Sequence, residues 1–135
     1  ANPDLLTEPF NNQSCVFRVS EEDFSLLILG DLAVEGGRRL LMKGYDLRAD
    51  AVQMAHHGQS GVEKTVYQAI SPKWAFWPTP DWLWQNVPYI GGPPGAGPFK
   101  TQEVAGWLKE LGAENITSFE HTVMFDSKTK RTVEI

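Results

Sequence analysis

Two adjacent histidines and an aspartate stand where two apolar runs of the sequence end. The run "LLILG" is followed by Asp31, and the run "VQMA" is followed by His56 and His57. Gly30 and Gly58 stand beside these residues and allow the backbone to turn sharply there. Carboxylate oxygen and imidazole nitrogen suit zinc, manganese or iron, and a bridging carboxylate suits a two-metal site. Each element alone is more typical of a turn or a solvated strand end, but the combination favours a metal site.

An alternation of strands and helices would bring Asp31, His56 and His57 together, and the sequence predicts such an alternation. β-rich apolar runs predict strands at 14–19, 24–30, 49–55 and 73–77, with a hairpin between the first two, and short strands at 116–120, 122–126 and 131–135. Apolar spacing and breakers predict helices at 33–44, 60–71, with Ser60 as a possible cap, and 100–113. Since the carboxyl ends of strands in an open α/β sheet collect functional groups at one edge, Asp31 and His56 should meet there. The predicted fold is α/β, a mixed β-sheet with helices on one face.

Composition sets limits on the function. The 135 residues suit a single domain, 1–135, and the net charge of −5 without a dense Lys/Arg run argues against an extended nucleic-acid surface. No apolar run approaches the ~18 residues of a membrane span. Cys15 is the only cysteine, so it cannot form an internal disulfide, and its place in "SCVFRV" predicts a buried thiol.

The motifs together resemble those of a known family. The segments "NNQSCVFRV", "FSLLILGDL", "DAVQMAHHGQSG" and "ISPKWAFW" are similar to the C-terminal half of metallo-β-lactamase-fold hydrolases. The nearest branch is the one related to the hydrolase domain of bacterial DNA-uptake (competence) channel proteins, with its "N-x-S", "L-x-G-D" and "H-H-G-S" segments. The resemblance runs from about Asn11 to Ile135. It implies that the sheet is half of an αββα sandwich and that the N-terminal half of the same protein is a partner.

By this resemblance, Asp31 would bridge two metal ions, which are zinc or, as the alternative, manganese, and one histidine would ligate the second ion. His56, the first after the strand, is the favoured ligand, and His57 is the alternative or an orienting group. The parent protein would be a hydrolase of an ester, amide or phosphodiester bond. The family's "H-x-H-x-D-H" is absent from this chain, and its later "H-P" is replaced by Gly97-Pro98. We therefore expect the isolated chain to be inactive and to bind zinc weakly or not at all.

A Trp-rich segment offers an alternative function, and the apolar strands predict self-association. Trp82, Trp84 and Tyr89 lie among prolines, where exposed aromatic side chains commonly line a ligand cleft. A non-catalytic binding or interaction domain that uses this segment is therefore the alternative to the hydrolase. If the second half is missing, the apolar strands would expose one sheet face, which predicts a homo-oligomer with the sheets face to face. The competing prediction is that the Trp-rich segment folds back and covers that face.

Overall fold

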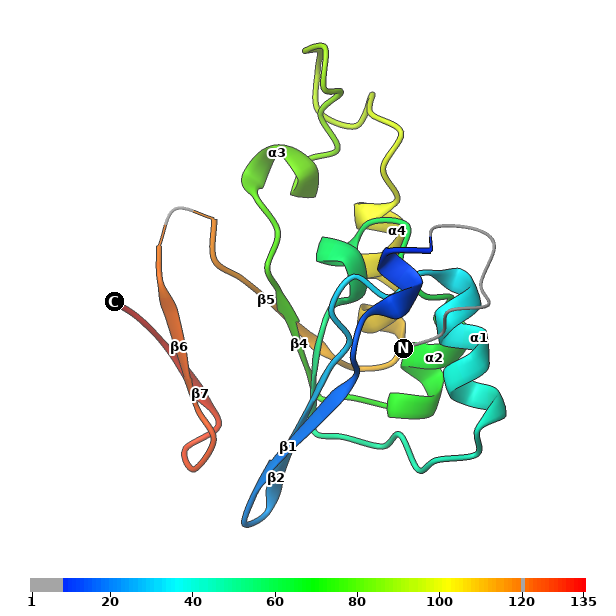
Figure 1. Cartoon of the computed structure of the whole chain (residues 1–135). Coiled ribbons are helices and arrows are strands. Elements are labelled where there is room, and N and C mark those ends of the chain that lie inside the picture. The colour runs from blue at the N-terminus through cyan, green and yellow to red at the C-terminus, as the bar shows by residue number, and fades with distance from the viewer. Residues whose placement is uncertain (1–8, 120) are drawn as a thin grey trace.

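The sheet is mixed and has five strands in sequence order. A computed structural model describes residues 9–119 and 121–135 (Figure 1). The strands, in sheet order, are β1 (Phe17–Glu21), β2 (Phe24–Ile28), β3 (Ala51–Gln53), β4 (Trp74–Trp77) and β5 (Glu114–Thr117). β1 pairs with β2 in antiparallel register, and the other neighbours are parallel. The predicted α/β class is therefore confirmed.

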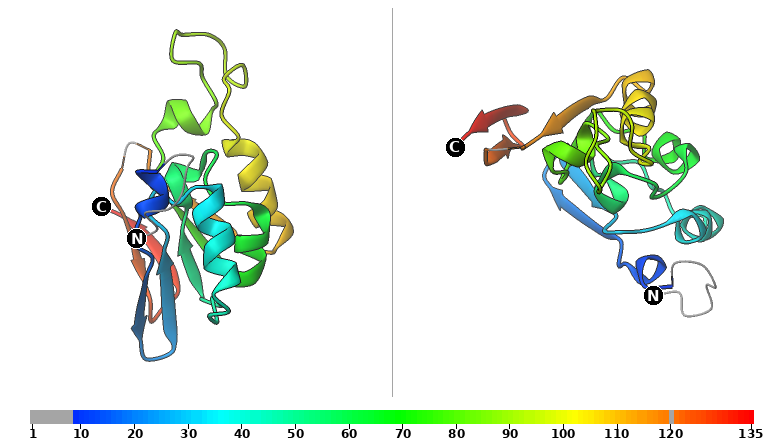
Figure 2. Two further views of the ribbon diagram at one scale, coloured as in Figure 1. Left: turned by 45° about the vertical axis from the view of Figure 1, so that its right-hand side comes forward. Right: turned by 90° about the horizontal axis from the view of Figure 1, so that it is seen from above.

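The longer helices cover one face of this sheet (Figure 2). They are α1 (Val34–Met42), α2 (Lys64–Ile70), α3 (Asp81–Trp84) and α4 (Thr101–Glu110), with short 3₁₀ turns η1 (Asn11–Gln13) and η2 (Ala55–Gly58). Each parallel strand lies beside its predecessor, and right-handed crossovers between such strands place successive helices on the same side. Figure 2 shows α1, α2 and α4 together on that side.

The core lies between the sheet and these helices. Leu29, which follows β2, and Val52 of β3 pack with Ile70 and Leu108 from the helices, and all four are fully buried. The two glycines of α1 weaken the helix intrinsically but permit close packing. A Cβ on Gly37, for example, would lie 2.9 Å from Cγ1 of Val62.

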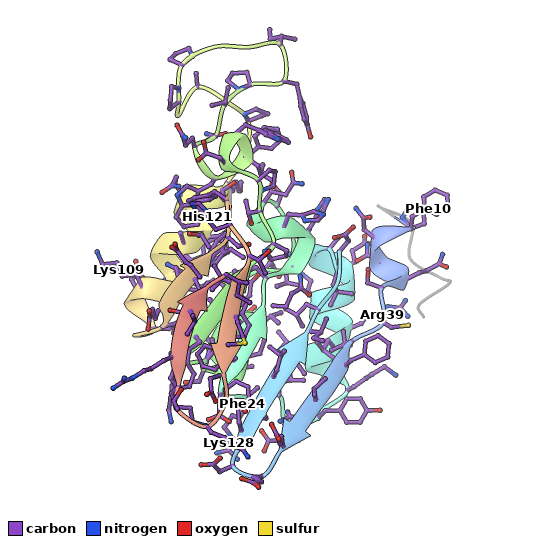
Figure 3. All side chains as sticks on the ribbon, turned by 90° about the vertical axis from the view of Figure 1, so that its left-hand side faces the viewer. Phe10, Phe24, Arg39, Lys109, His121 and Lys128 are labelled. Atoms are coloured by element: carbon purple, nitrogen blue, oxygen red, sulfur yellow. The ribbon has the colours of Figure 1, made fainter. Side chains whose placement is uncertain are left out.

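The opposite face of the sheet is covered only in part. A hairpin of β6 (Val123–Asp126) and β7 (Arg131–Glu134) lies against it and places the ring of Phe125 5.1–5.5 Å from those of Phe24, Trp74 and Phe76. The other half of this face, on β1 and β2, carries Phe17 and Val19, which are 58% and 54% exposed. Figure 3 shows the hairpin beside the two strands.

Several sequence predictions are corrected by the structure. Cys15 is exposed, because the segment before β1 runs along the surface. Helix α2 begins at Lys64 after Glu63, so Ser60 does not cap it. The Trp-rich segment does not fold back over the open face, since the β6–β7 hairpin takes that place.

Among the described residues, no helix has the length and apolar character needed to cross a bilayer.

Candidate metal centre

Three strand ends meet at the edge of the sheet that carries the candidate residues. Asp31 follows β2, and His56 and His57 lie in η2 after β3. The backbone N–H of His56 donates to the carbonyl of Gly30 at 2.9 Å, which joins the first two strand ends. The hydroxyl of Thr79, after β4, donates to the carbonyl of His57 at 2.6 Å and joins the third. The carboxyl ends of the parallel strands thus bring the three candidates to one region.

The backbone at the histidines has an unusual conformation. His56, His57 and Gly58 follow one another with φ of 50°, 56° and 78°, all in the left-handed region. Non-glycine residues occupy that region at a cost, and they occur in tight turns and cluster at functional sites. Gly58 has a further constraint, since a Cβ there would lie 2.0 Å from an atom of the Trp77 ring. The turn therefore presents two histidines while its third residue lies against the indole.

His57 is the histidine that faces Asp31. Its Nδ1 lies 2.7 Å from the carbonyl oxygen of Pro78, and its Nε2 lies 3.6 Å from Oδ1 of Asp31. A carbonyl only accepts, so Nδ1 carries a proton, and in a neutral ring Nε2 then presents a lone pair to the carboxylate. The separation exceeds the usual hydrogen-bond range of ~2.7–3.2 Å. Two acceptors placed in this way leave room between them for a cation, a proton or a bridging water.

The separation of the two ligand atoms suits a shared ion. When two atoms ligate the same zinc ion at ~2.0–2.2 Å in tetrahedral geometry, they lie about 3.3–3.5 Å apart. The Nε2 of His57 and the Oδ1 of Asp31 are 3.6 Å apart. The bond from Nδ1 of His57 to the Pro78 carbonyl is also the kind of contact that fixes the tautomer of a metal-ligating histidine. The donor set therefore fits part of a metal centre.

His56 occupies a different environment. Its Nδ1 is buried and has no hydrogen-bond partner among the described residues. The two imidazole rings are 6.4 Å apart between centroids, so they do not stack on each other. A buried ring nitrogen without a partner is costly, and an ion, a water molecule or strain in the turn accounts for such a group. His56 therefore remains a candidate for the same site, although the structure records no contact between it and Asp31.

The described residues provide fewer ligands than a metal centre needs. Within residues 9–119 and 121–135, no group of three or more His, Cys, Asp or Glu side chains is placed to hold one ion. A tetrahedral zinc site needs four ligands, and a two-metal site needs more. His121, the remaining histidine, lies next to β6 and lines a separate cavity of about 290 Å³ with Asp81 and Glu134.

Three residues that position the pair escaped the sequence analysis. The hydroxyl of Ser14 accepts the N–H of Asp31 at 3.1 Å, and Oε1 of Gln53 accepts the N–H groups of Leu29 and Gly30 at 3.1 and 3.0 Å. Thr79 holds the carbonyl of His57, as described above. Ser14 belongs to the quoted "N-x-S" segment, so a signal for it was present. Gln53 and Thr79 carry no motif, and only their hydrogen bonds in the folded chain show their roles.

A cavity of about 320 Å³ lies on the open face beside the site, between the sheet and the β6–β7 hairpin. Gln53 and Pro78, which hold the strand ends of Asp31 and His57, form part of its wall, and Phe76 and Phe125 form an apolar part. Its volume is at the low end of the ~300–1,000 Å³ of small-molecule sites.

No protein-family model and no curated protein matches the chain. The case for a function therefore rests on the geometry of the site and on the motif resemblance. The structure brings Asp31 and His57 together, leaves His56 beside them with a buried nitrogen, and gives His121 a different place.

Proposed function

We propose that this chain is the C-terminal part of a metal-dependent hydrolase of an ester, amide or phosphodiester bond. The observation that carries the proposal is the pairing of His57 Nε2 with Asp31 Oδ1 at 3.6 Å, together with the bond that fixes the tautomer of His57. The motif resemblance to metallo-β-lactamase-fold hydrolases supports it from an independent direction. The remaining ligands would come from the N-terminal half of the same protein.

The residues of this chain divide into ligands and positioning groups. Asp31 and His57 would hold a divalent ion, zinc or manganese, and His56 is the further candidate. Ser14 and Thr79 bind the backbone of Asp31 and His57 and fix their separation. A bound ion would supply Lewis acidity and activate water for hydrolysis.

The sequence upstream of Ala1 in the gene offers the first test. A segment "H-x-H-x-D-H" there supports the hydrolase, and its absence contradicts it. In a longer protein that contains this segment, we expect zinc-dependent cleavage of a chromogenic ester or phosphodiester. Asp31→Asn should lower that rate by more than the ~10–100-fold that loss of an outer hydrogen-bond partner costs. An Asp31→Asn protein with full activity would overturn the proposal.

A non-catalytic binding domain is the second candidate, and the Trp-rich segment favours it. The rings of Trp82, Tyr89 and Phe99 lie within 5.1–5.7 Å of one another, and Tyr89 is 75% exposed. Exposed aromatic clusters of this kind mark interaction surfaces. A longer protein without the "H-x-H-x-D-H" segment and without hydrolase activity would favour this candidate.

A further inference from the structure

The backbone that leads into the histidine turn is anchored to three different elements of the fold. The N–H of Met54 donates to a carbonyl of β4, and the N–H of His56 donates to a carbonyl that follows β2, each at 2.9 Å. Between them, the N–H of Ala55 donates to the hydroxyl of Tyr67 in α2 at 3.3 Å, and this bond is buried. The turn is therefore tied to the sheet by backbone bonds and to the helix layer by the side chain of Tyr67.

The bond from Ala55 differs from its two neighbours because its acceptor is a side chain. A substitution cannot delete the carbonyls that accept the N–H groups of Met54 and His56, whereas Tyr67→Phe deletes the hydroxyl alone. Ala55 is 0% exposed, so solvent does not reach its N–H in place of the lost acceptor. A buried N–H without a partner is costly, and this cost favours a rotation of the backbone toward another acceptor. Loss of the hydroxyl should therefore move the turn.

Tyr67 itself has a fixed place in the core. It lies on α2 with Val66 and Ile70, and all three side chains are buried. Its carbonyl accepts the N–H of Ser71 at 2.8 Å, and the carbonyl of Ile70 accepts the N–H of Ala49 at 3.1 Å. Burial raises the pKa of the Tyr67 hydroxyl, so this group stays protonated at any pH at which a histidine can bind a metal. The hydroxyl is therefore a stable acceptor for the turn.

The two histidines that follow this bond need such support. His56 and His57 have φ of 50° and 56°, in the left-handed region. Non-glycine residues persist in such a conformation only where the surrounding structure over-determines it. The bond from Nδ1 of His57 to the carbonyl of Pro78 holds the end of this segment, and Tyr67 holds its start. The direction of the His57 ring toward Asp31 therefore depends on both bonds.

We propose that Tyr67 is a positioning residue for the candidate metal centre. Its hydroxyl fixes the peptide plane that leads into the left-handed turn, and the turn sets the separation of the His57 ring from Asp31. Tyr67 acts through the backbone and is not a ligand. The metal-binding part of this inference rests on the proposed function, whereas the effect on the turn does not.

NMR spectroscopy of Tyr67→Phe and the wild-type chain tests the proposal, first without metal. The backbone amide signals of His57 and Gly58 and the imidazole signals of His57 should shift, because the turn rearranges to pair the N–H of Ala55. A zinc titration of the same samples should then show an affinity about tenfold lower in the variant. This is the low end of the ~10–100-fold that outer partners of metal ligands contribute, since Tyr67 holds the backbone and not the ligand ring.

The matched control is Thr101→Val, which removes another fully buried hydroxyl. That hydroxyl donates to the carbonyl of Leu83 at 2.9 Å and joins α4 to α3. The control should leave the signals of His57 and the zinc affinity unchanged, and circular dichroism shows that both variants are folded. In the wild-type chain, the amide of Ala55 should exchange with deuterium as slowly as that of Met54, because both are bonded and buried.

The effect on the turn is overturned if Tyr67→Phe leaves the signals of His57 and Gly58 in place, or if Thr101→Val shifts them as much. An Ala55 amide that exchanges as fast as an exposed amide overturns it as well. Shifted signals with an unchanged zinc affinity would overturn the role in metal binding. Zinc that leaves the wild-type His57 signals unshifted at millimolar concentration would contradict the proposed function, while the metal-free signals still decide whether Tyr67 positions the turn.

Discussion

The two faces of the central sheet differ in how completely this chain covers them. On the helix side, Leu27, Val52 and Ala75 at neighbouring register positions are 0–3% exposed. On the other side, Phe125 of the hairpin covers Trp74 and Phe76, but Phe17 and Val19 are more than half exposed. The candidate metal centre shows the same contrast, because hydrogen bonds fix its backbone while its ligand set is short. The sheet is thus well covered on the helix side and half open on the other, and the candidate ligands have fixed backbones without a third ligand among the described residues.

Substitutions on the two sides of the sheet should differ strongly in how much they lower the free energy of unfolding, and this is the largest effect that we expect. Leu108→Ala removes a fully buried side chain from the helix side and should lower the free energy of unfolding by about 2–5 kcal/mol. Val19→Ala removes a side chain that is 54% exposed and should lower it by less than about 1 kcal/mol. Urea denaturation followed by circular dichroism measures both. Equal losses would show that the open face is buried in solution.

The turn at the histidines should be nearly as sensitive to one added methyl group. Gly58→Ala places a Cβ against Trp77 at a φ of 78° and should cost about 2–4 kcal/mol, the sum of overpacking and left-handed strain. Gly44→Ala is the matched control, since its φ is 71° and no atom lies within 4 Å of the added Cβ. The control should cost only about 1 kcal/mol. Similar values for both would mean that the Gly58–Trp77 contact does not form.

The sequence predicted the helix side better than the open side for a physical reason. Apolar periodicity reports burial, so the strand at "VQMA" and the helix around Leu108 were predicted from their own residues. It does not report which element provides the burial, so the place of the β6–β7 hairpin was missed. The candidate site shows the same limit. Strand-end positions predicted the region of Asp31 and the two histidines, but the side chain that faces Asp31 depends on the left-handed turn and the Pro78 carbonyl, which no motif encodes.

Self-association should depend on the open face. Substitutions in that face should have the smallest effect on the free energy of unfolding. We expect a concentration-dependent dimer or larger oligomer by light scattering, because the exposed half of this face can be buried against a second copy. Phe17→Ser/Val19→Ser should shift the equilibrium toward the monomer while changing the free energy of unfolding of the monomer by less than about 1 kcal/mol. A wild-type chain that remains monomeric at high micromolar concentration would contradict this expectation.

The most direct test of the account is a zinc titration followed by the imidazole NMR signals of the three histidines. Zinc should bind more weakly than micromolar and shift the signals of His57, with those of His121 unchanged. His57→Asn should abolish binding without disturbing the turn, because asparagine tolerates the left-handed backbone. Asp31→Asn should weaken binding at least ~10-fold. His56→Asn, the matched control on the neighbouring residue, should weaken it less. Zinc that leaves His57 unshifted at millimolar concentration, or that binds equally well to the Asp31→Asn variant, would contradict the shared site.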